Sequence, residues 1–282
     1  MAAKKTILVV LAHPDDESFG MGGTLAYYAS KGVDVHLVCA TRGEAGTVDA
    51  VYLKKHETIA TLREAELRCA AKALGLKSVS LLGYRDSGMA GSKDNKHAKS
   101  LFRAPVDQVA GKIVAFIRRL KPQVVLTFDE VGGYHHPDHI AINKATVRAF
   151  HAAGNARKYP RAGKAFRPEK LYFNALNRRR LRRIVFIMRL SGKDPTKIGR
   201  NNDIDLTELT RDTDTPAHVT INYRKIDDRK DKADACHASQ QGGWGTPSII
   251  DRLTRLFGRK NVFTRIYPPA SDDYRATDLF AE

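Results

Sequence analysis

The fold is decided by one short stretch, Thr6-Ile-Leu-Val-Val-Leu-Ala12. It is apolar and rich in β-branched residues, which is typical of a strand at the centre of a parallel sheet. Further strands are predicted over residues 33–40, 78–82 and 123–128, and helices over residues 21–30, 56–74, 105–120 and 137–150. Because strands and helices alternate, we expect a doubly wound, mostly parallel α/β sheet of the Rossmann-like kind.

The second half of the chain is less regular. A strand is predicted over residues 170–176, another begins at Thr220, a polar helix covers residues 226–241, and residues 191–216 have the composition of a loop. No linker separates these segments from the first half. We therefore expect one domain over residues 1–282, in which residues 1–153 form the core sheet and residues 154–282 a C-terminal elaboration.

The composition is that of a globular protein with a substantial core, since 42% of the 282 residues are hydrophobic. No apolar run is long enough to cross a bilayer, and the run Ile7–Leu11 is too short for a signal sequence. The cysteines Cys39, Cys69 and Cys236 are odd in number and widely separated. We therefore expect a cytoplasmic protein without a membrane span, whose cysteines are buried or half-buried thiols.

The chain is strongly basic, with a formal net charge of +17 and a pI of about 9.8. Such an excess favours nucleic acids, anionic membrane surfaces or acidic substrates as partners. The densest cluster is Arg178–Arg183, followed by Arg189, and it lacks the interleaved aromatics of a single-strand binding platform. We interpret it as the solvated face of a local insert, and we do not expect a nucleic-acid partner.

The first motif that carries chemistry is His13-Pro-Asp-Asp-Glu17, directly after the first strand. Imidazole and carboxylate groups are suitable zinc ligands, and His13 and Asp16 can converge on one point in such a turn. Asp15 would then lie beside the metal without binding it. Taken alone, the two aspartates could equally cap the start of a helix.

The second motif, Gly132-Gly-Tyr-His-His-Pro-Asp-His139, follows the strand predicted over residues 123–128. Its His139 supplies a third ligand and completes a zinc site of His13, Asp16 and His139 with an open position for water. The same three ligands also accept Fe²⁺. Two strand-end clusters of histidine and aspartate are hard to explain by packing, so the sequence predicts a metal site.

Together the stretches Ala12-His-Pro-Asp-Asp-Glu17 and His136-Pro-Asp-His139 resemble the LmbE-like, PIG-L-type N-acetylglucosamine deacetylases. The resemblance is closest to the branch that contains the mycothiol-pathway deacetylase and the mycothiol conjugate amidase. It is carried further by Gly22–Ala26, Thr41–Gly46, Tyr84–Met89 and Ala235–Gln240. It covers the first 150 residues and the helix near residue 240, but not residues 155–220.

The resemblance implies a role for each residue of the two motifs. His13, Asp16 and His139 would bind zinc, and Asp15 would act as the base that deprotonates the attacking water. His136 would stabilise the oxyanion, with Asp138 orienting its imidazole. Either Asp15 or His136 could deliver the proton to the leaving amine.

The remaining site residues are predicted with open alternatives. The resemblance gives Tyr134 a hydrogen bond to the oxyanion, although a packed tyrosine is also compatible. His135 departs from the family pattern, which has glycine there, and we expect it to face solvent. Substrate contacts are expected from Arg63 and Asp86, with Glu44 and Met89 lining the pocket and His237 as a further contact; each could instead serve ion pairing or packing.

The predicted function is zinc-dependent removal of an N-acetyl group from an N-acetylglucosamine-type sugar conjugate, which releases acetate and a free amine. The alternatives are a zinc amidase that cleaves a thiol-conjugate amide and, on net charge alone, a basic nucleic-acid-binding protein. The partner is expected to be a small amino-sugar conjugate, and a homo-oligomer is compatible with the sequence.

Overall fold

The protein folds around one seven-stranded sheet. The structure is a computed structural model, and it describes residues 4–176, 178–199, 204–212, 214–243 and 259–282. The strand order is β3-β2-β1-β4-β5-β7-β6. Neighbours from β3 to β5 are parallel, whereas β7 runs antiparallel to both β5 and β6. The strands are β1 (Thr6–Leu11), β2 (Asp34–Cys39), β3 (Ser78–Leu81), β4 (Val124–Thr127), β5 (Lys170–Asn174), β6 (Val219–Asn222) and β7 (Lys260–Tyr267).

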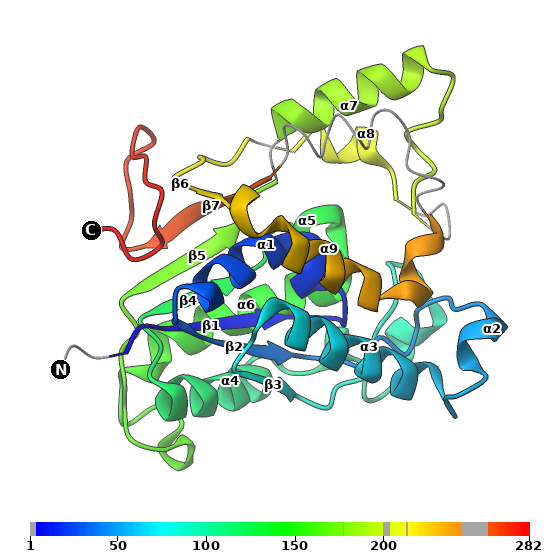
Figure 1. Ribbon diagram of the computed structural model, residues 1–282. Helices are drawn as coiled ribbons and strands as arrows, with labels where there is room; N and C mark the ends of the chain where they lie inside the picture. The colour runs from blue at the N-terminus through cyan, green and yellow to red at the C-terminus, as the bar shows by residue number, and fades with distance from the viewer. Residues whose placement is uncertain (1–3, 177, 200–203, 213, 244–258) are drawn as a thin grey trace.

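Helices form a layer on each side of this sheet (Figure 1). In one group α1 packs against α3 and α9, and in the other α4 packs against α6. The helices are α1 (Asp16–Ser30), α2 (Ala50–Leu53), α3 (Ile59–Leu74), α4 (Val106–Leu120), α5 (Gly132–His135), α6 (Pro137–Ala153), α7 (Arg178–Leu190), α8 (Leu206–Leu209) and α9 (Asp227–Cys236). The predicted α/β fold class with a mostly parallel sheet is therefore confirmed.

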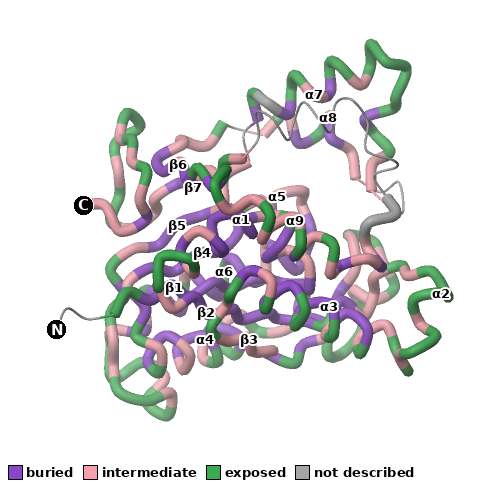
Figure 2. Tube along the Cα trace, viewed as in Figure 1, coloured by how far each residue is buried: buried purple, intermediate pink, exposed green. Residues whose placement is uncertain are grey.

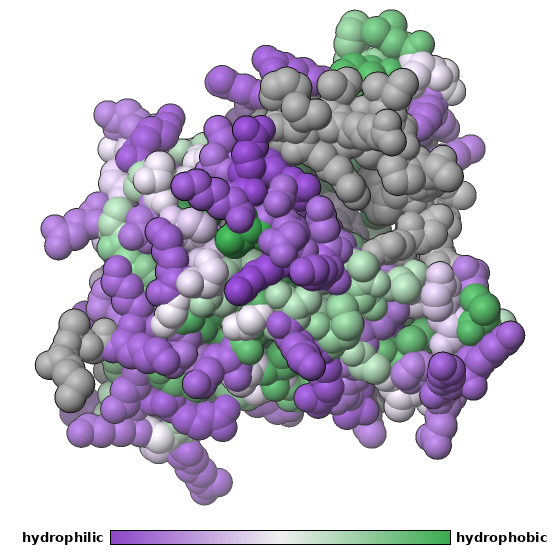
Figure 3. Space-filling view, in the orientation of Figure 1, coloured by the Kyte–Doolittle hydropathy of each residue, from purple (hydrophilic) through white to green (hydrophobic). Residues whose placement is uncertain are grey.

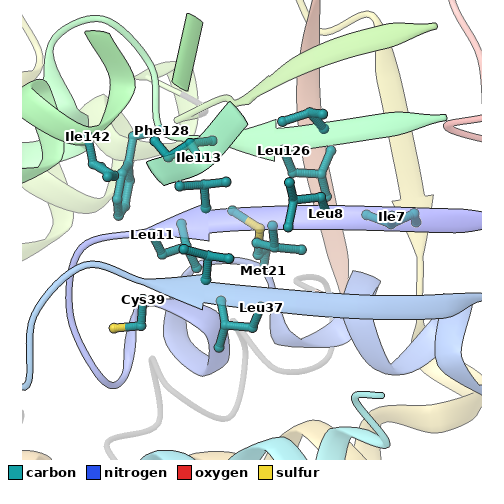
Figure 4. Close-up of a cluster of buried hydrophobic side chains, with 14 of the residues drawn as sticks. Ile7, Leu8, Leu11, Met21, Leu37, Cys39, Ile113, Leu126, Phe128 and Ile142 are labelled. Carbon is teal, nitrogen blue, oxygen red and sulfur yellow. The ribbon is translucent and has the colours of Figure 1, made fainter. Parts of the chain in front are cut away.

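The core lies where β1 crosses the middle of the molecule (Figure 2). Residues Ile7 to Leu11 are all fully buried, because β1 pairs with β2 on one side and with β4 on the other. The outer surface in view is mostly hydrophilic, as the net charge leads one to expect (Figure 3). Side chains from the helix layers, among them Met21, Ile113 and Ile142, fill the space against the strands (Figure 4).

Several local expectations differ from the structure. The first helix begins at Asp16, inside the first motif, rather than at Met21, where the backbone leaves the helical conformation. The loop predicted over residues 191–216 includes the short helix α8, and the strand β7 was not predicted. Because β7 follows a segment without clear periodicity, its pairing with β5 and β6 depends on tertiary structure rather than on local pattern.

The cysteine expectation was wrong for two of the three residues. Cys69 in α3 and Cys236 in α9 form a disulfide bond, whereas Cys39 is a buried free thiol. The two bonded residues are 167 positions apart, and only the packing of α3 against α9 brings them together. Within the described parts of the chain, no helix is long and apolar enough to cross a membrane.

Candidate active site

The candidate site lies at the carboxyl ends of β1 and β4, where ligands bind in sheets of this kind. His13 comes two residues after β1 ends, and α1 begins at Asp16. After β4 the chain makes the short turn α5, and His136 then caps the N-terminus of α6. Because β1 and β4 are neighbours in the sheet, the two motifs lie side by side.

Three side chains from the two motifs converge on one point. The Nδ1 atom of His13 lies 3.2 Å from Nε2 of His139. The carboxylate of Asp16 lies 3.6 Å from His13 Nδ1 and 3.2 Å from His139 Nε2. Ligands about 2.0–2.2 Å from a tetrahedral zinc ion lie roughly 3.3–3.6 Å from one another. The three groups are therefore spaced to hold a divalent cation.

The outer nitrogens of both imidazoles have polar partners. His13 Nε2 lies 3.2 Å from the Asp138 carboxylate, and His139 Nδ1 lies 3.1 Å from the carbonyl oxygen of Gly132. A metal-binding histidine commonly donates its other N–H to such an acceptor, which fixes the tautomer. Both rings thus turn their inner nitrogen toward the Asp16 carboxylate, which is the orientation that a metal site requires.

The position of Asp138 corrects the sequence-based expectation. Its carboxylate was expected to orient His136, but it lies against His13 and also accepts a hydrogen bond of 2.8 Å from the backbone N–H of Ser87. Only the backbone N–H of Asp138 reaches His136, donating to Nδ1 at 3.2 Å. The reason is its place in the first turn of α6, whose first residues direct Asp138 inward toward β1. Asp138 therefore orients a predicted metal ligand.

His136 stands beside the three converging groups. One ring nitrogen from each of His13, His136 and His139 lies within 4.8 Å of the others. Burial holds the pKa of His136 well below its usual range, and the charges on His13 and His139 lower it further. Because Nδ1 accepts a hydrogen bond from Asp138, the neutral ring carries its proton on Nε2. That N–H is available as a hydrogen-bond donor.

Asp15 is held next to this cluster in a conformation that few non-glycine residues adopt. Its φ is 114°, and its backbone N–H donates to the Glu17 carboxylate at 2.9 Å. The Arg63 guanidinium donates to the Asp15 carboxylate at 2.6 Å and also to the carbonyl of Pro14. Burial raises the pKa of Asp15 to about 6, against the opposing effect of Arg63. Asp15 is thus a firmly positioned carboxyl group.

Tyr134 and His135 belong to the loop between β4 and α6. The half-buried Tyr134 ring packs edge-on against His139 and His136, at centroid distances of 5.0 and 5.8 Å. His135 was expected to face solvent, but its side chain is only 32% exposed and its Nε2 lies 3.0 Å from the Asp212 carboxylate. The loop is thereby tied to the residues after α8.

The structure gives the predicted substrate residues Arg63 and Asp86 different surroundings. Arg63 is 4% exposed and covered by Gly43, where an added Cβ would come within 2.6 Å of the guanidinium. It therefore holds Asp15 rather than facing an open pocket. Asp86 accepts a hydrogen bond of 2.8 Å from the Gly88 N–H and lies 3.4 Å from His13 Nε2, so it belongs to the cluster itself.

The other three predicted contacts lie farther from the convergence point. Glu44 accepts a hydrogen bond of 3.0 Å from the backbone of Asp86, and Met89 is half-buried in the following loop. His237 is fully buried, with Nε2 2.6 Å from the Glu17 carboxylate. The structure thus gives His237 a place behind the first motif.

Three site residues were not singled out from the sequence. Glu17 and Ser87 are fully buried and bond to Asp15 and Asp138, respectively. Glu66 accepts two hydrogen bonds of 2.8 Å from Ser239 and anchors the segment after α9. Glu17 and Ser87 stood within quoted motifs, but only their burial shows that they support the site.

Comparisons with known proteins agree with this architecture. A family model described as PIG-L, GlcNAc-PI de-N-acetylase, matches residues 8–150. A curated protein of Acidothermus cellulolyticus, named 1D-myo-inositol 2-acetamido-2-deoxy-alpha-D-glucopyranoside deacetylase, is 37% identical and aligns over 98% of this chain and 94% of its own length.

Solved structures show the same fold. The conserved protein TT1542 of Thermus thermophilus superposes with a TM-score of 0.62 at 25% identity, covering 98% of each chain. The N,N'-diacetylchitobiose deacetylase of Pyrococcus horikoshii gives a TM-score of 0.60 at 21% identity, covering 94% of this chain and 84% of its own. These structures are similar along nearly the entire chain.

Proposed function

Because the chain belongs to the PIG-L family of de-N-acetylases, we propose that it removes the N-acetyl group of a glucosamine joined to an inositol ring, releasing acetate. It is a hydrolase that acts on an amide bond. Support for the inositol glycoside comes from the curated relatives, which carry that substrate in their names. Their names favour deacetylation over the cleavage of a thiol-conjugate amide.

The resident cation is proposed to be zinc, held by His13, Asp16 and His139. One observation carries this proposal: each imidazole turns one nitrogen toward Asp16, while its other nitrogen lies against the Asp138 carboxylate or the Gly132 carbonyl. A bound zinc ion would polarise the acyl oxygen and make a water molecule more acidic. Two nitrogens and a carboxylate also suit Fe²⁺, which metal analysis distinguishes.

Asp15 serves as the base that accepts the proton of the attacking water. It neighbours Asp16 in the chain, and Arg63 and Glu17 fix its position. A carboxyl group that has just gained this proton can pass it to the amine as the amide bond breaks. His136 is a poorer donor for that step, since its neutral ring would be left as an anion.

His136 instead serves the oxyanion. Its Nε2–H points away from the capping bond with Asp138 and is free to donate to the oxygen that develops negative charge. Tyr134 lies against His136 and His139, so its hydroxyl is a second candidate donor on the same side. In comparable sites a donor of this kind lowers the activation barrier by roughly 3 kcal/mol.

The test is an acetate-release assay on N-acetylglucosaminyl inositol, with metal analysis of the same sample. Asp15→Asn should lose about 10³-fold or more in activity while it retains the metal. The matched control is Asp107→Asn, an exposed carboxylate paired with Arg148, which should leave activity unchanged. Full activity of Asp15→Asn would overturn the base assignment, and a protein without any transition metal would overturn the metal site.

A further inference from the structure

Helix α7 carries the basic cluster and has two distinct faces. The inner face packs Leu181 and Val185 against Leu206 and Leu209 of α8, in a small apolar cluster separate from the main core. Arg178, at the start of the helix, is also buried and lies 3.4 Å from Asp212. These positions account for one side of the helix only.

The outer face forms a continuous stripe along the helix. Arg179, Arg183, Phe186 and Leu190 follow one another at spacings of four, three and four residues, so they share one side. We call these four residues the α7 stripe. Phe186 is 62% and Leu190 73% exposed, which makes them the most exposed large hydrophobic residues described, with Ile187 beside them at 43%.

This surface lies at the edge of the molecule. Figure 1 shows α7 projecting from the body next to α8, and hydrophobic side chains gather at its outer end in Figure 3. The exposed apolar residues therefore do not cover another element of the described chain.

The stripe also carries unbalanced positive charge. The helix has no acidic residue, and Arg182 is neutralised by Asp214 at 2.6 Å. Within the ranges that the structure describes, no ion pair involves Arg179, Arg183 or Arg189. The surface that would cover α7 must therefore be apolar and anionic at once.

We propose that the α7 stripe docks on an anionic lipid surface. Interfacial helices combine arginines, which bind acidic headgroups, with Phe and Leu side chains that enter the acyl boundary. A nucleic acid would satisfy the arginines but would leave Leu190 and Ile187 exposed, and only one aromatic is present for stacking. A second copy of the chain would supply the same positive charge.

Docking through this face would place the active site beside the lipid. Tyr134 packs against the inner side of the same small cluster, between α7 and the convergence point of the histidines. The stripe and the site thus share one structural unit. The proposal concerns a surface and holds whatever substrate the enzyme cleaves.

Vesicle co-sedimentation of the full chain tests the proposal directly. Binding is expected to vesicles that contain phosphatidylglycerol and not to vesicles of phosphatidylcholine alone, and it should weaken as salt screens the arginines. Arg179→Ala with Arg183→Ala should reduce partitioning roughly 25-fold, since each basic residue contributes about fivefold. Phe186→Ser with Leu190→Ser should reduce it on the order of tenfold or more.

Matched controls remove exposed groups elsewhere. Arg157→Ala and Val51→Ser, both exposed and distant in sequence from α7, should bind as the unaltered chain does. Circular dichroism and acetate release verify that each variant is folded. Binding to neither vesicle type, or binding that the stripe variants leave unchanged, overturns the proposal. The proposal is also overturned if the chain binds RNA and Phe186→Ser leaves that binding unchanged, or if the chain forms a concentration-dependent dimer and does not bind lipid.

Discussion

Two regions meet at the active site, and they are built differently. The loops after β1 and β4 extend from strands that are buried on both faces and paired on both sides. The α7–α8 region is held by four buried apolar residues, Leu181, Val185, Leu206 and Leu209, and by polar contacts to the site loop. The predicted catalytic groups thus lie on the strongly buried region, while the α7–α8 region contacts the adjoining loop through Tyr134 and His135.

The difference follows from the burial available to each region. A strand inside a parallel sheet loses nearly all contact with water, so a change at its end is resisted by the whole core. A helix attached through one short cluster can open locally at a much lower free-energy cost.

The largest expected effect comes from removing a predicted metal ligand on the rigid side. His139→Ala deletes one of the three converging groups, so metal content and acetate release should fall together, activity by roughly 10³-fold or more. Chelation of the unaltered protein should give the same loss, and added zinc should reverse it. Retained metal in His139→Ala would show that the ligand set is different.

One cavity-creating substitution in each region tests how much that region contributes to the free energy of unfolding. Leu8 is fully buried in β1, and Leu8→Ala should lower the free energy of unfolding by about 2–5 kcal/mol. Leu181→Ala, in the α7–α8 cluster, should leave the main thermal transition nearly unchanged and increase hydrogen exchange within α7. Equal losses of global stability would mean that the two regions unfold as one unit.

Sequence reasoning located the strand β1 and the polar motif directly after it. The apolar stretch of β1 and the motif at His13 are adjacent in the chain, so local pattern places the predicted ligands at the end of the strand. The contact between Asp138 and His13 was missed because these residues are 125 positions apart and meet only where β1 and β4 are neighbours in the sheet. The disulfide and the His135–Asp212 pair depend in the same way on packing, which no local spacing encodes.

Removing the guanidinium that holds Asp15 should have an intermediate effect. Arg63→Met leaves Asp15 without its partner at 2.6 Å, so we expect kcat to fall about 10²-fold with KM and metal content nearly unchanged. Arg68→Met is the matched control, since Arg68 lies on the same helix, is largely exposed and pairs with Glu64, another residue of that helix. A rise in KM with kcat preserved would instead assign Arg63 to substrate binding.

The smallest effect tests the connection between the two regions. Asp212 lies 3.0 Å from His135 and 3.4 Å from Arg178, so its carboxylate joins the loop that carries Tyr134 to the base of α7. Asp212→Asn keeps the shape but weakens both contacts, and we expect a loss of roughly three- to tenfold in kcat without loss of metal. The exposed Asp214, two positions after Asp212, pairs with Arg182 of α7 and provides the control Asp214→Asn. If both variants behave alike, the α7–α8 region acts on the site only through its apolar cluster, and the polar connection to the loop that carries Tyr134 has no role in turnover.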